Sequence, residues 1–355
     1  MNRKLAWLGA VCALLLSACA TRAPVQPEPE TPPAKVEKAP GLSPKLAAAA
    51  DYLTRMSEQQ DRLYQVAAPL LINNAPLCKA HSRNLLGFTA KNRYSYAGDY
   101  NEASHLALGM GDQLQVTGVL AGSGAAKAGL RRGDGLVSAE GKALPKGPNA
   151  STLAGSVLGP LVSKLATIDM IVARDGSNRN IAVPVTRACA FGVELGNADN
   201  VNSYADGSRV LVTRGMVNFA QSNDELAYVL ARGMAHNILG HAQSQRQSST
   251  QSSIIDNLIS VRPDLSMLIG SGGIKAMPAE LDAAADRLAV YLLARAGYDL
   301  DGIEKFWKRL EQTYPASVLN GYVANHPSTS ARLAAIDKSI AEVSAKKSAK
   351  QPLVP

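Results

Sequence analysis

The chain has 355 residues, of which 46% are apolar and 19% are charged, and its formal net charge is +8. This composition excludes a disordered chain and suffices for roughly two packed domains. The basic surplus is spread over single charges and a C-terminal run of lysines, with no interleaved aromatic residues that could stack on bases. We therefore expect a mildly basic, solvated surface and no nucleic-acid partner.

The N-terminus has the pattern of an export signal. Arg3 and Lys4 precede an apolar run over 5–16, which is too short to span a bilayer. The tetrapeptide Leu-Ser-Ala-Cys at 16–19 follows and resembles the lipobox of bacterial lipoproteins. The resemblance implies a signal peptide over 1–18; an ordinary signal or a retained anchor helix is the alternative.

The lipobox resemblance also implies where the protein resides. Cys19 would be acylated and anchored in the membrane, and the proline-rich segment 19–42 would be a semi-extended tether. Ala20 follows the cysteine, where an aspartate often marks inner-membrane retention in this class. We therefore expect an outer-membrane lipoprotein that faces the periplasm.

Two further cysteines, Cys78 and Cys189, remain after Cys12 leaves with the signal peptide and Cys19 is committed to lipid. In an oxidising compartment, cysteines that have no other role are expected to pair. The sequence therefore predicts a disulfide between them, with two separate buried thiols as the alternative.

We expect an α+β protein in which a mainly helical domain is interrupted by a β-rich one. The predicted segments are 43–100 and 188–345 for the helical domain, 101–187 for the insertion, and 346–355 for a basic tail. Ser222 and Glu225 have the spacing of a helix capping box. The polar Ser/Gln stretch 243–253 is predicted to be a mobile loop. Apolar periodicity predicts one strand over 209–213 and helices over 43–72, 222–238, 279–296, 300–314 and 328–345.

The insertion contains glycine turns between short apolar runs. The sequence Gly-Ser-Gly-Ala-Ala-Lys-Ala-Gly-Leu at 122–130, followed by Gly-Asp at 133–134, resembles the PDZ domains of bacterial envelope proteases. The resemblance implies a groove helix over 156–165, a closing hairpin of 168–173 with 180–185, and peptide binding by strand addition. A nest for the peptide carboxylate would form at the loop Leu106, Ala107, Leu108 and Gly109. A generic small β-rich domain is the alternative.

The helix that starts at Ser222 continues as Asp-Glu-Leu-Ala-Tyr-Val-Leu-Ala-Arg-Gly-Met-Ala-His over 224–236, and a Gly-His follows at 240–241. Further on, Asp-Ala-Ala-Ala-Asp-Arg occupies 282–287, and His-Pro-Ser-Thr-Ser-Ala-Arg occupies 326–332. Together these motifs resemble the gluzincin metallopeptidases that include HtpX, BepA, Oma and the CAAX prenyl proteases. In that family, His-Glu-x-x-His supplies two zinc ligands and a general base, and a later glutamate supplies the third ligand.

Carried over position by position, the family motif is degenerate in this chain. Arg232 stands at the first histidine, Gly233 at the general base and Ala284 at the third ligand, so only His236 remains. A site in a catalytic zinc enzyme needs three protein ligands, and we expect no metal or other cofactor here. His326 and Asp286 could join His236 in a rescued zinc site.

Arg232 is instead expected to pair with Asp282, Asp286 or Glu280 on the later helix. His236 and His241 lie five residues apart, about 140° around a helix, so they should not converge. Both are then predicted to be hydrogen-bonded interior histidines.

The resemblance implies a pseudopeptidase that binds envelope proteins or peptides, in protein quality control, and contacts the membrane through its lipid. Two alternatives stay open from the sequence. One is an active zinc metalloendopeptidase with a non-standard ligand set that degrades envelope proteins, and the other is a structural assembly scaffold.

Overall fold

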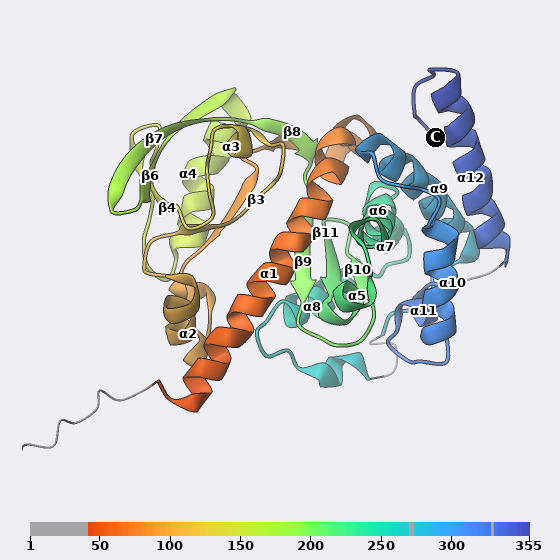
Figure 1. The fold of residues 1–355 in the computed structure, drawn as a ribbon, viewed down its shortest axis with the longest axis horizontal. Helices are drawn as coiled ribbons and strands as arrows, with labels where there is room; N and C mark the ends of the chain where they lie inside the picture. Colours follow the sequence, from red (N-terminus) through yellow and green to blue (C-terminus); the bar gives the residue numbers. More distant parts are fainter. Residues whose placement is uncertain (1–41, 270–272, 328–329) are drawn as a thin grey trace, which may run out of the picture. The chain divides into compact units, whose positions relative to one another are not determined.

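The computed structural model describes residues 42–269, 273–327 and 330–355, which form one unit from Leu42 to Pro355 (Figure 1). The predicted signal peptide, the predicted acylation site Cys19 and all of the tether before residue 42 lie outside the described residues. Within the described part, none of the helices has the length and apolar content needed to cross a membrane. Helices and sheets are mixed, which confirms the α+β class.

The helices are α1 (Pro44–Asn73), α2 (Asp99–Leu108), α3 (Gly124–Lys127), α4 (Ala150–Lys164), α5 (Arg214–Phe219), α6 (Asn223–Ile238), α7 (His241–Ser244), α8 (Ser248–Leu258), α9 (Ala279–Ala296), α10 (Ile303–Thr313), α11 (Tyr322–Asn325) and α12 (Ser330–Ser348). The strands are β1 (Ser82–Leu85), β2 (Phe88–Lys91), β3 (Gln115–Val119), β4 (Gly135–Ala139), β5 (Lys142–Ala143), β6 (Thr167–Arg174), β7 (Ser177–Pro184), β8 (Thr186–Cys189), β9 (Gly192–Gly196), β10 (Ser203–Ala205) and β11 (Arg209–Thr213).

Helix α1 joins the two parts of the described chain. It begins after Ser43, whose side chain accepts a hydrogen bond from the Leu46 amide, and it ends at Asn73, close to the predicted end. One side contacts α6 and α9, and another contacts α2 and β3. Figure 1 shows α1 in orange between the β-rich part and the other helices.

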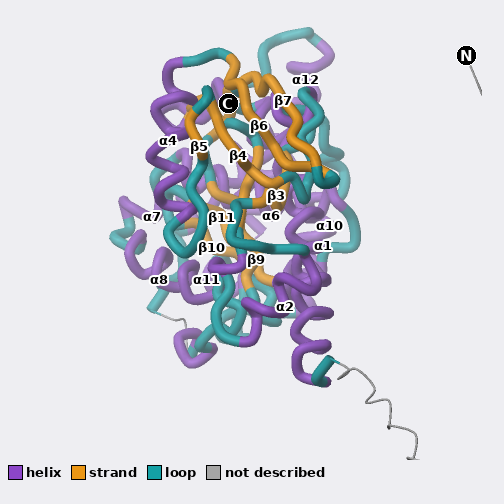
Figure 2. The backbone as a smooth tube through the Cα atoms, turned by 90° about the vertical axis from the view of Figure 1, so that its left-hand side faces the viewer, coloured by secondary structure: helices purple, strands orange, loops and turns teal. Residues whose placement is uncertain are grey.

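The β-rich part is an antiparallel sheet in the order β2-β3-β4-β6-β7, with β5 paired to β4. Figure 2 shows strands of this sheet with α4 beside them. The predicted hairpin is present as β6 and β7, and the predicted groove helix is the C-terminal part of α4. Strand β2 pairs with β3, so this part starts before the boundary that we set at residue 101.

The chain enters and leaves the β-rich part through a two-stranded ribbon. Strands β1 and β8 pair antiparallel, with Ser82 opposite Cys189. The predicted disulfide is confirmed: Cys78 and Cys189 are bonded, their Cα atoms are 5.6 Å apart, and both side chains are fully buried. The bond therefore fastens the base of the insertion to the main core.

The second sheet has the order β10-β11-β9, in which β9 and β11 are parallel and β10 is antiparallel. Helix α6 packs on this sheet and against α9, and α12 packs on the other side of α9. The main core lies between these elements. Its largest fully buried side chains include Leu63, Leu70, Met216, Arg232, Tyr291 and Phe306.

One local prediction was wrong. The stretch 243–253 is not a loop but belongs largely to α7 and α8, because the apolar C-terminal half of α8 packs into a small separate core with Leu211. In the predicted basic tail 346–355, helix α12 continues to Ser348, and Lys346 Nζ donates to the Val354 carbonyl, so the chain folds back on itself.

Candidate functional site

Helix α6 carries the one histidine that remains of the family motif. Ser222 caps its start, because its hydroxyl accepts from the Glu225 amide at 3.1 Å. The Glu225 carboxylate accepts from the Gln221 amide instead of closing the predicted capping box, and it also binds Arg309. Every residue over 226–238 is buried.

Helix α9 presents two carboxylates to α6. Asp282 and Asp286 are four residues apart, so they share one helix face, and they are 1% and 2% exposed. Ala284, which we assigned to the third ligand, lies about 200° from Asp282 around the helix and is exposed. That assignment was wrong, because Asp282 is the residue on α9 that faces His236.

Arg232 lies between the two carboxylates. Its Nη2 is 2.6 Å from Asp282 Oδ1, and its Nε donates to Asp286 Oδ1 at 2.6 Å. Nη1 donates to the hydroxyl of Tyr322, and the guanidinium lies 5.8 Å from the ring centroid of Trp307. Among the described residues, Glu280 forms no ion pair with it. Arg232 thus joins α6 to α9 at the position where the family has a metal ligand.

A second arginine completes the charge cluster. Arg332 on α12 donates to Asp286 through Nε at 2.7 Å and through Nη2 at 3.2 Å. Its Nη1 donates to the carbonyls of His326 and Pro327. Asp286 is therefore bound by two guanidinium groups, which removes it from the rescue set that we predicted with His236 and His326.

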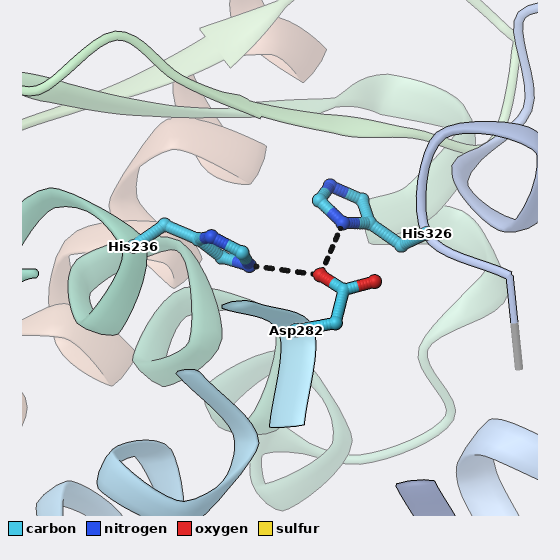
Figure 3. A group of neighbouring side chains, drawn as sticks. All are labelled: His236, Asp282 and His326. Carbon is cyan, nitrogen blue, oxygen red and sulfur yellow. Dashed lines mark hydrogen bonds and ion pairs between the residues drawn. The ribbon is translucent and has the colours of Figure 1, made fainter. Parts of the chain in front are cut away.

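The histidines converge on the other carboxylate, that of Asp282. His326 Nδ1 is 2.9 Å from Asp282 Oδ1, and His236 Nε2 is 3.5 Å from the same oxygen. Figure 3 shows both rings directed at the same oxygen of this carboxylate. The rescue hypothesis named Asp286 and not Asp282, because the sequence does not show which of the two aspartates Arg332 binds.

His241 also reaches this group, contrary to our prediction. Its Nδ1 lies 2.9 Å from His236 Nδ1. The angular argument assumed one continuous helix, but α6 ends at Ile238 and Gly240 is left-handed with a φ of 69°. The reversal at Gly240 turns His241 back toward His236. Gly240 was the sequence signal that the helix ends before His241.

Burial and the arginines keep these histidines neutral. Burial lowers the pKa of His236 well below its usual value, and the Arg232 charge lowers it further. Burial also lowers the pKa of His326 and of His241, against the attraction of Asp282. Burial would raise the pKa of Asp282, but Arg232 and His326 outweigh it and hold that pKa at about 2. The cluster thus pairs arginines with aspartates around uncharged imidazoles.

Three of these side chains have the composition of a zinc site. Ligand atoms of His236, Asp282 and His326 all lie within 4.8 Å of one another, and zinc is held at about 2.0–2.2 Å by such atoms. However, Asp282 Oδ1 already contacts Arg232 at 2.6 Å. A dication 4 Å from this guanidinium would be repelled by roughly 8 kcal/mol at an effective dielectric constant of about 20. With Arg232 in place, the donor set does not fit zinc.

The general-base position is closed as well. Gly233 lies where the family has its glutamate, and a Cβ atom there would come within 2.6 Å of Val210 Cγ1 on β11. The sheet thus packs directly onto the glycine, and a longer side chain would need Val210 to move. Among the described residues no carboxylate occupies this position of α6.

The predicted carboxylate nest at 106–109 is also wrong. Leu106, Ala107 and Leu108 form the last turn of α2, and Gly109 is its left-handed C-cap with a φ of 66°. The Gly109 amide donates to the carbonyls of Ser104 and His105, so it is not open to a ligand. The sequence did contain signals for this helix: the acidic residues Asp99 and Glu102 in its first turn, and Gly109 at its C-terminal end.

Comparisons with known proteins agree with the motif resemblance. Residues 166–340 match peptidase family M48. The chain is 24% identical to the mitochondrial metalloendopeptidase OMA1 of Schizosaccharomyces pombe over 147 residues, and this aligned segment is 40% of the chain. The chain spans 44% of the length of that relative. The family match includes Arg232 on α6, Asp282 on α9 and His326, which follows α11.

Proposed function

We propose that this metallopeptidase-like protein, with its M48-type segment, is an outer-membrane lipoprotein that binds segments of envelope proteins without cleaving them. It would act in protein quality control on the periplasmic side, with no metal or other cofactor. Three features support the location: the N-terminal signal pattern, the acylation motif at Cys19, and a disulfide that suits an oxidising compartment.

The observation that carries the proposal is the place of Arg232. This arginine is 1% exposed and binds both aspartates of α9. A guanidinium stays protonated in proteins, so it neutralises these carboxylates permanently. An internal cation thus holds the same two helices together, and this supports the proposal that the protein keeps its fold without a metal.

A zinc metalloendopeptidase with a changed ligand set is the second candidate, and one observation favours it. Three atoms of the buried cluster have no hydrogen-bond partner among the described residues, and two of them, His236 Nε2 and Asp282 Oδ2, are of a kind that can bind a metal; the third is Arg232 Nη2. Such orphaned atoms usually have an explanation, and a metal ion is one of them. A structural scaffold without any ligand is the third candidate.

Metal content and peptide cleavage of the full-length protein in detergent separate the first two candidates. We expect the wild-type protein, after incubation with zinc and desalting, to retain none in stoichiometric amount and to leave an unfolded protein substrate intact. Arg232→His should gain zinc, because it removes the cation and places an imidazole four residues from His236. Arg309→His is the matched control, since it adds a histidine beside Glu225, away from the cluster.

Stoichiometric zinc in the wild-type protein that disappears in His236→Ala would overturn the proposal in favour of the second candidate. Binding of unfolded envelope proteins by the wild-type protein, measured by co-sedimentation, is the expected positive result. Its complete absence would favour the scaffold.

A further inference from the structure

Exposed apolar side chains gather in three segments of the described chain. These are the start of α1, the stretch 259–269 after α8, which we call the apolar turn, and the stretch 315–321, which we call the α10–α11 loop. Among the described residues, twelve large apolar side chains are exposed, and seven of them lie in these segments. The seven are Leu42, Ile259, Leu265, Met267, Ile269, Val318 and Leu319. Single exposed apolar residues are ordinary on a protein surface, whereas a group of them marks an interaction surface.

The apolar turn and the α10–α11 loop are fastened to the same connection of the main core, the loop between β9 and β10. The side chain of Asn197 in this connection donates to the Ser260 carbonyl at 2.6 Å. The side chain of Asn202, further along the same connection, donates to the Asn320 carbonyl at 2.8 Å. The two segments therefore lie on one side of the main core.

The apolar turn also lies against the N-terminal half of α1. The Tyr52 hydroxyl is 3.5 Å from the Val261 carbonyl oxygen, and Val261 packs on the small core that Leu53 forms with Ala103 of α2. Figures 1 and 2 show the first turn of α1 and the apolar turn, turquoise in Figure 1, at the same end of the molecule. The C-terminus lies toward the opposite end. The exposed apolar groups thus belong to one end of the described chain.

The backbone of the apolar turn is ordered so that its apolar side chains face solvent. It contains the short 3₁₀ helix η3 (Leu265–Leu268), which Asp264 caps by accepting from the Ser266 amide at 2.9 Å. Leu268 is buried in the small core of α8, whereas Leu265 and Ile269 are 55% and 78% exposed. One buried leucine thus anchors the turn while its apolar neighbours remain in water. Contact with another apolar phase would remove that unfavourable exposure.

The chain that precedes α1 indicates which apolar phase is near. The predicted tether 19–42 joins α1 at this end of the molecule. A lipid on Cys19 would hold the start of α1 within roughly 80 Å of the bilayer, which is the reach of a fully extended chain of this length. The apolar end of the domain would then be present near the membrane at a high effective concentration, so even a weak contact would form.

The charges of the apolar turn are compatible with a lipid surface. Arg262 is exposed, and its guanidinium lies 5.2 Å from the centroid of the Tyr100 ring. The carboxylate of Asp264, the acidic residue in the turn, is engaged by the Ser266 amide. At a membrane surface, apolar side chains enter the boundary between headgroups and acyl chains, and basic groups stay beside the phosphates. Arg262 directly precedes the exposed apolar residues and suits that place.

We propose that this end of the molecule rests on the bilayer that holds the lipid anchor, with Leu265, Met267 and Ile269 inserted between the headgroups and the α10–α11 loop beside them. The proposal rests on the proposed lipoprotein function and adds a protein surface to the membrane contact. Two contacts, the lipid and this surface, would hold the domain in one orientation. The C-terminal end of α12 would then point away from the membrane.

Tryptophan fluorescence of the full-length protein in vesicles tests the insertion. Met267→Trp adds an indole at the proposed contact, and the wild-type protein with Trp7 and the buried Trp307 gives the background. In phosphatidylcholine vesicles with brominated acyl chains, the added emission should fall by roughly half or more. Bromines near the headgroups should quench more than bromines near the chain ends, because such insertion reaches only about 5–10 Å.

Two controls use the same measurement. Gln351→Trp places an exposed indole in the C-terminal segment, toward the opposite end of the molecule, and its emission should not be quenched. Leu265→Ser/Ile269→Ser in the Met267→Trp protein removes two inserted side chains, and the quenching should fall to that of the Gln351→Trp protein. Leu153→Ser in the same background removes an exposed leucine of α4 and should leave the quenching unchanged. Circular dichroism establishes that the variants are folded.

Flotation with the vesicles and the mass of the protein separate the surface from the lipid anchor. If the protein floats but Met267→Trp is quenched no more than Gln351→Trp, the surface proposal is wrong and the anchor stands. If the protein does not float, both fail. Quenching of Met267→Trp in a protein whose mass shows no acyl group would support the surface and contradict the acylation. A dimer in sedimentation that shields the added tryptophan from iodide without vesicles would assign the surface to a second copy and overturn the proposal.

Discussion

Removing the guanidinium of Arg232 tests whether an internal cation holds the degenerate site together. Arg232→Met keeps most of the apolar stem and removes the charge and all donors. The native side chain is 1% exposed and lies 2.6 Å from both Asp282 and Asp286. In the variant, Asp286 keeps Arg332, whereas Asp282 keeps its short contact to His326 but loses its closest cation.

The expected loss of folding free energy follows from these contacts. Breaking a buried pair by removing one partner costs about 3–5 kcal/mol, because the other charge stays buried. The remaining partners of both aspartates place the loss near 3 kcal/mol. The lost ring contacts with Trp307 and Tyr322, at 5.8 and 5.4 Å from the guanidinium carbon, add about 1 kcal/mol. We expect a total of about 4 kcal/mol.

Equilibrium urea unfolding, followed by far-UV circular dichroism, measures this loss. Arg232→Met/Asp282→Asn should be about 2 kcal/mol more stable than Arg232→Met, because it removes the charge left behind. Arg287→Met is the control: its pair with Glu342 is substantially exposed, so its loss should stay within about 1 kcal/mol. If Arg232→Met costs no more than this control, the buried carboxylates do not depend on the arginine and the reasoning is refuted.

Three other predictions concern the histidines, the disulfide and the anchor. Burial lowers the pKa of His236, His241 and His326 in the folded protein. The unfolded chain therefore binds more protons than the folded protein below about pH 6.5. The free energy of unfolding should be constant above that pH and fall by about 1.4–4 kcal/mol per pH unit below it. Asp282, whose pKa is about 2, stays charged over this range. A constant urea midpoint between pH 7 and 5.5 would contradict this prediction. Cys78→Ala/Cys189→Ala opens a crosslink across a sequence separation of 111 residues and should lower stability by about 4 kcal/mol; an unchanged urea midpoint would argue against it. Cys19→Ala should move the protein from the membrane to the soluble fraction on cell fractionation, and an unchanged membrane fraction would refute acylation.

The sequence predicted those elements whose signals are local. Helix α9 was bounded correctly at 279–296 because Gly297, with a φ of 85°, stops it. The disulfide followed from elimination among the cysteines, and the hairpin of β6 and β7 followed from the resemblance of the insertion to PDZ domains; Asp175 and Gly176 form its turn. A few neighbouring residues decide where α9 ends, whereas the disulfide could be predicted without a local signal because only two cysteines were left to pair.

Residues whose role depends on a distant partner were predicted less well. The third ligand position was placed at Ala284, although only Asp282 and Asp286 have the four-residue spacing that faces α6. Helix periodicity alone could have excluded Ala284. That Asp286 binds Arg332 while Asp282 binds His326 could not be predicted, because 46 and 44 residues separate these partners in the sequence.

The arrangement of the second sheet places the histidine cluster and the cavity beside β9 in different surroundings. Strand β11 lies in the middle, with β10 at one edge and β9 at the other. Tyr204 on β10 lies beside the histidine cluster, and Gly233 packs on Val210 of the central strand β11. Glu194 on β9 instead lines a cavity of about 510 Å³ that neither Arg232 nor Gly233 lines. Changes at Arg232 or Gly233 should therefore affect stability, with little effect on that cavity.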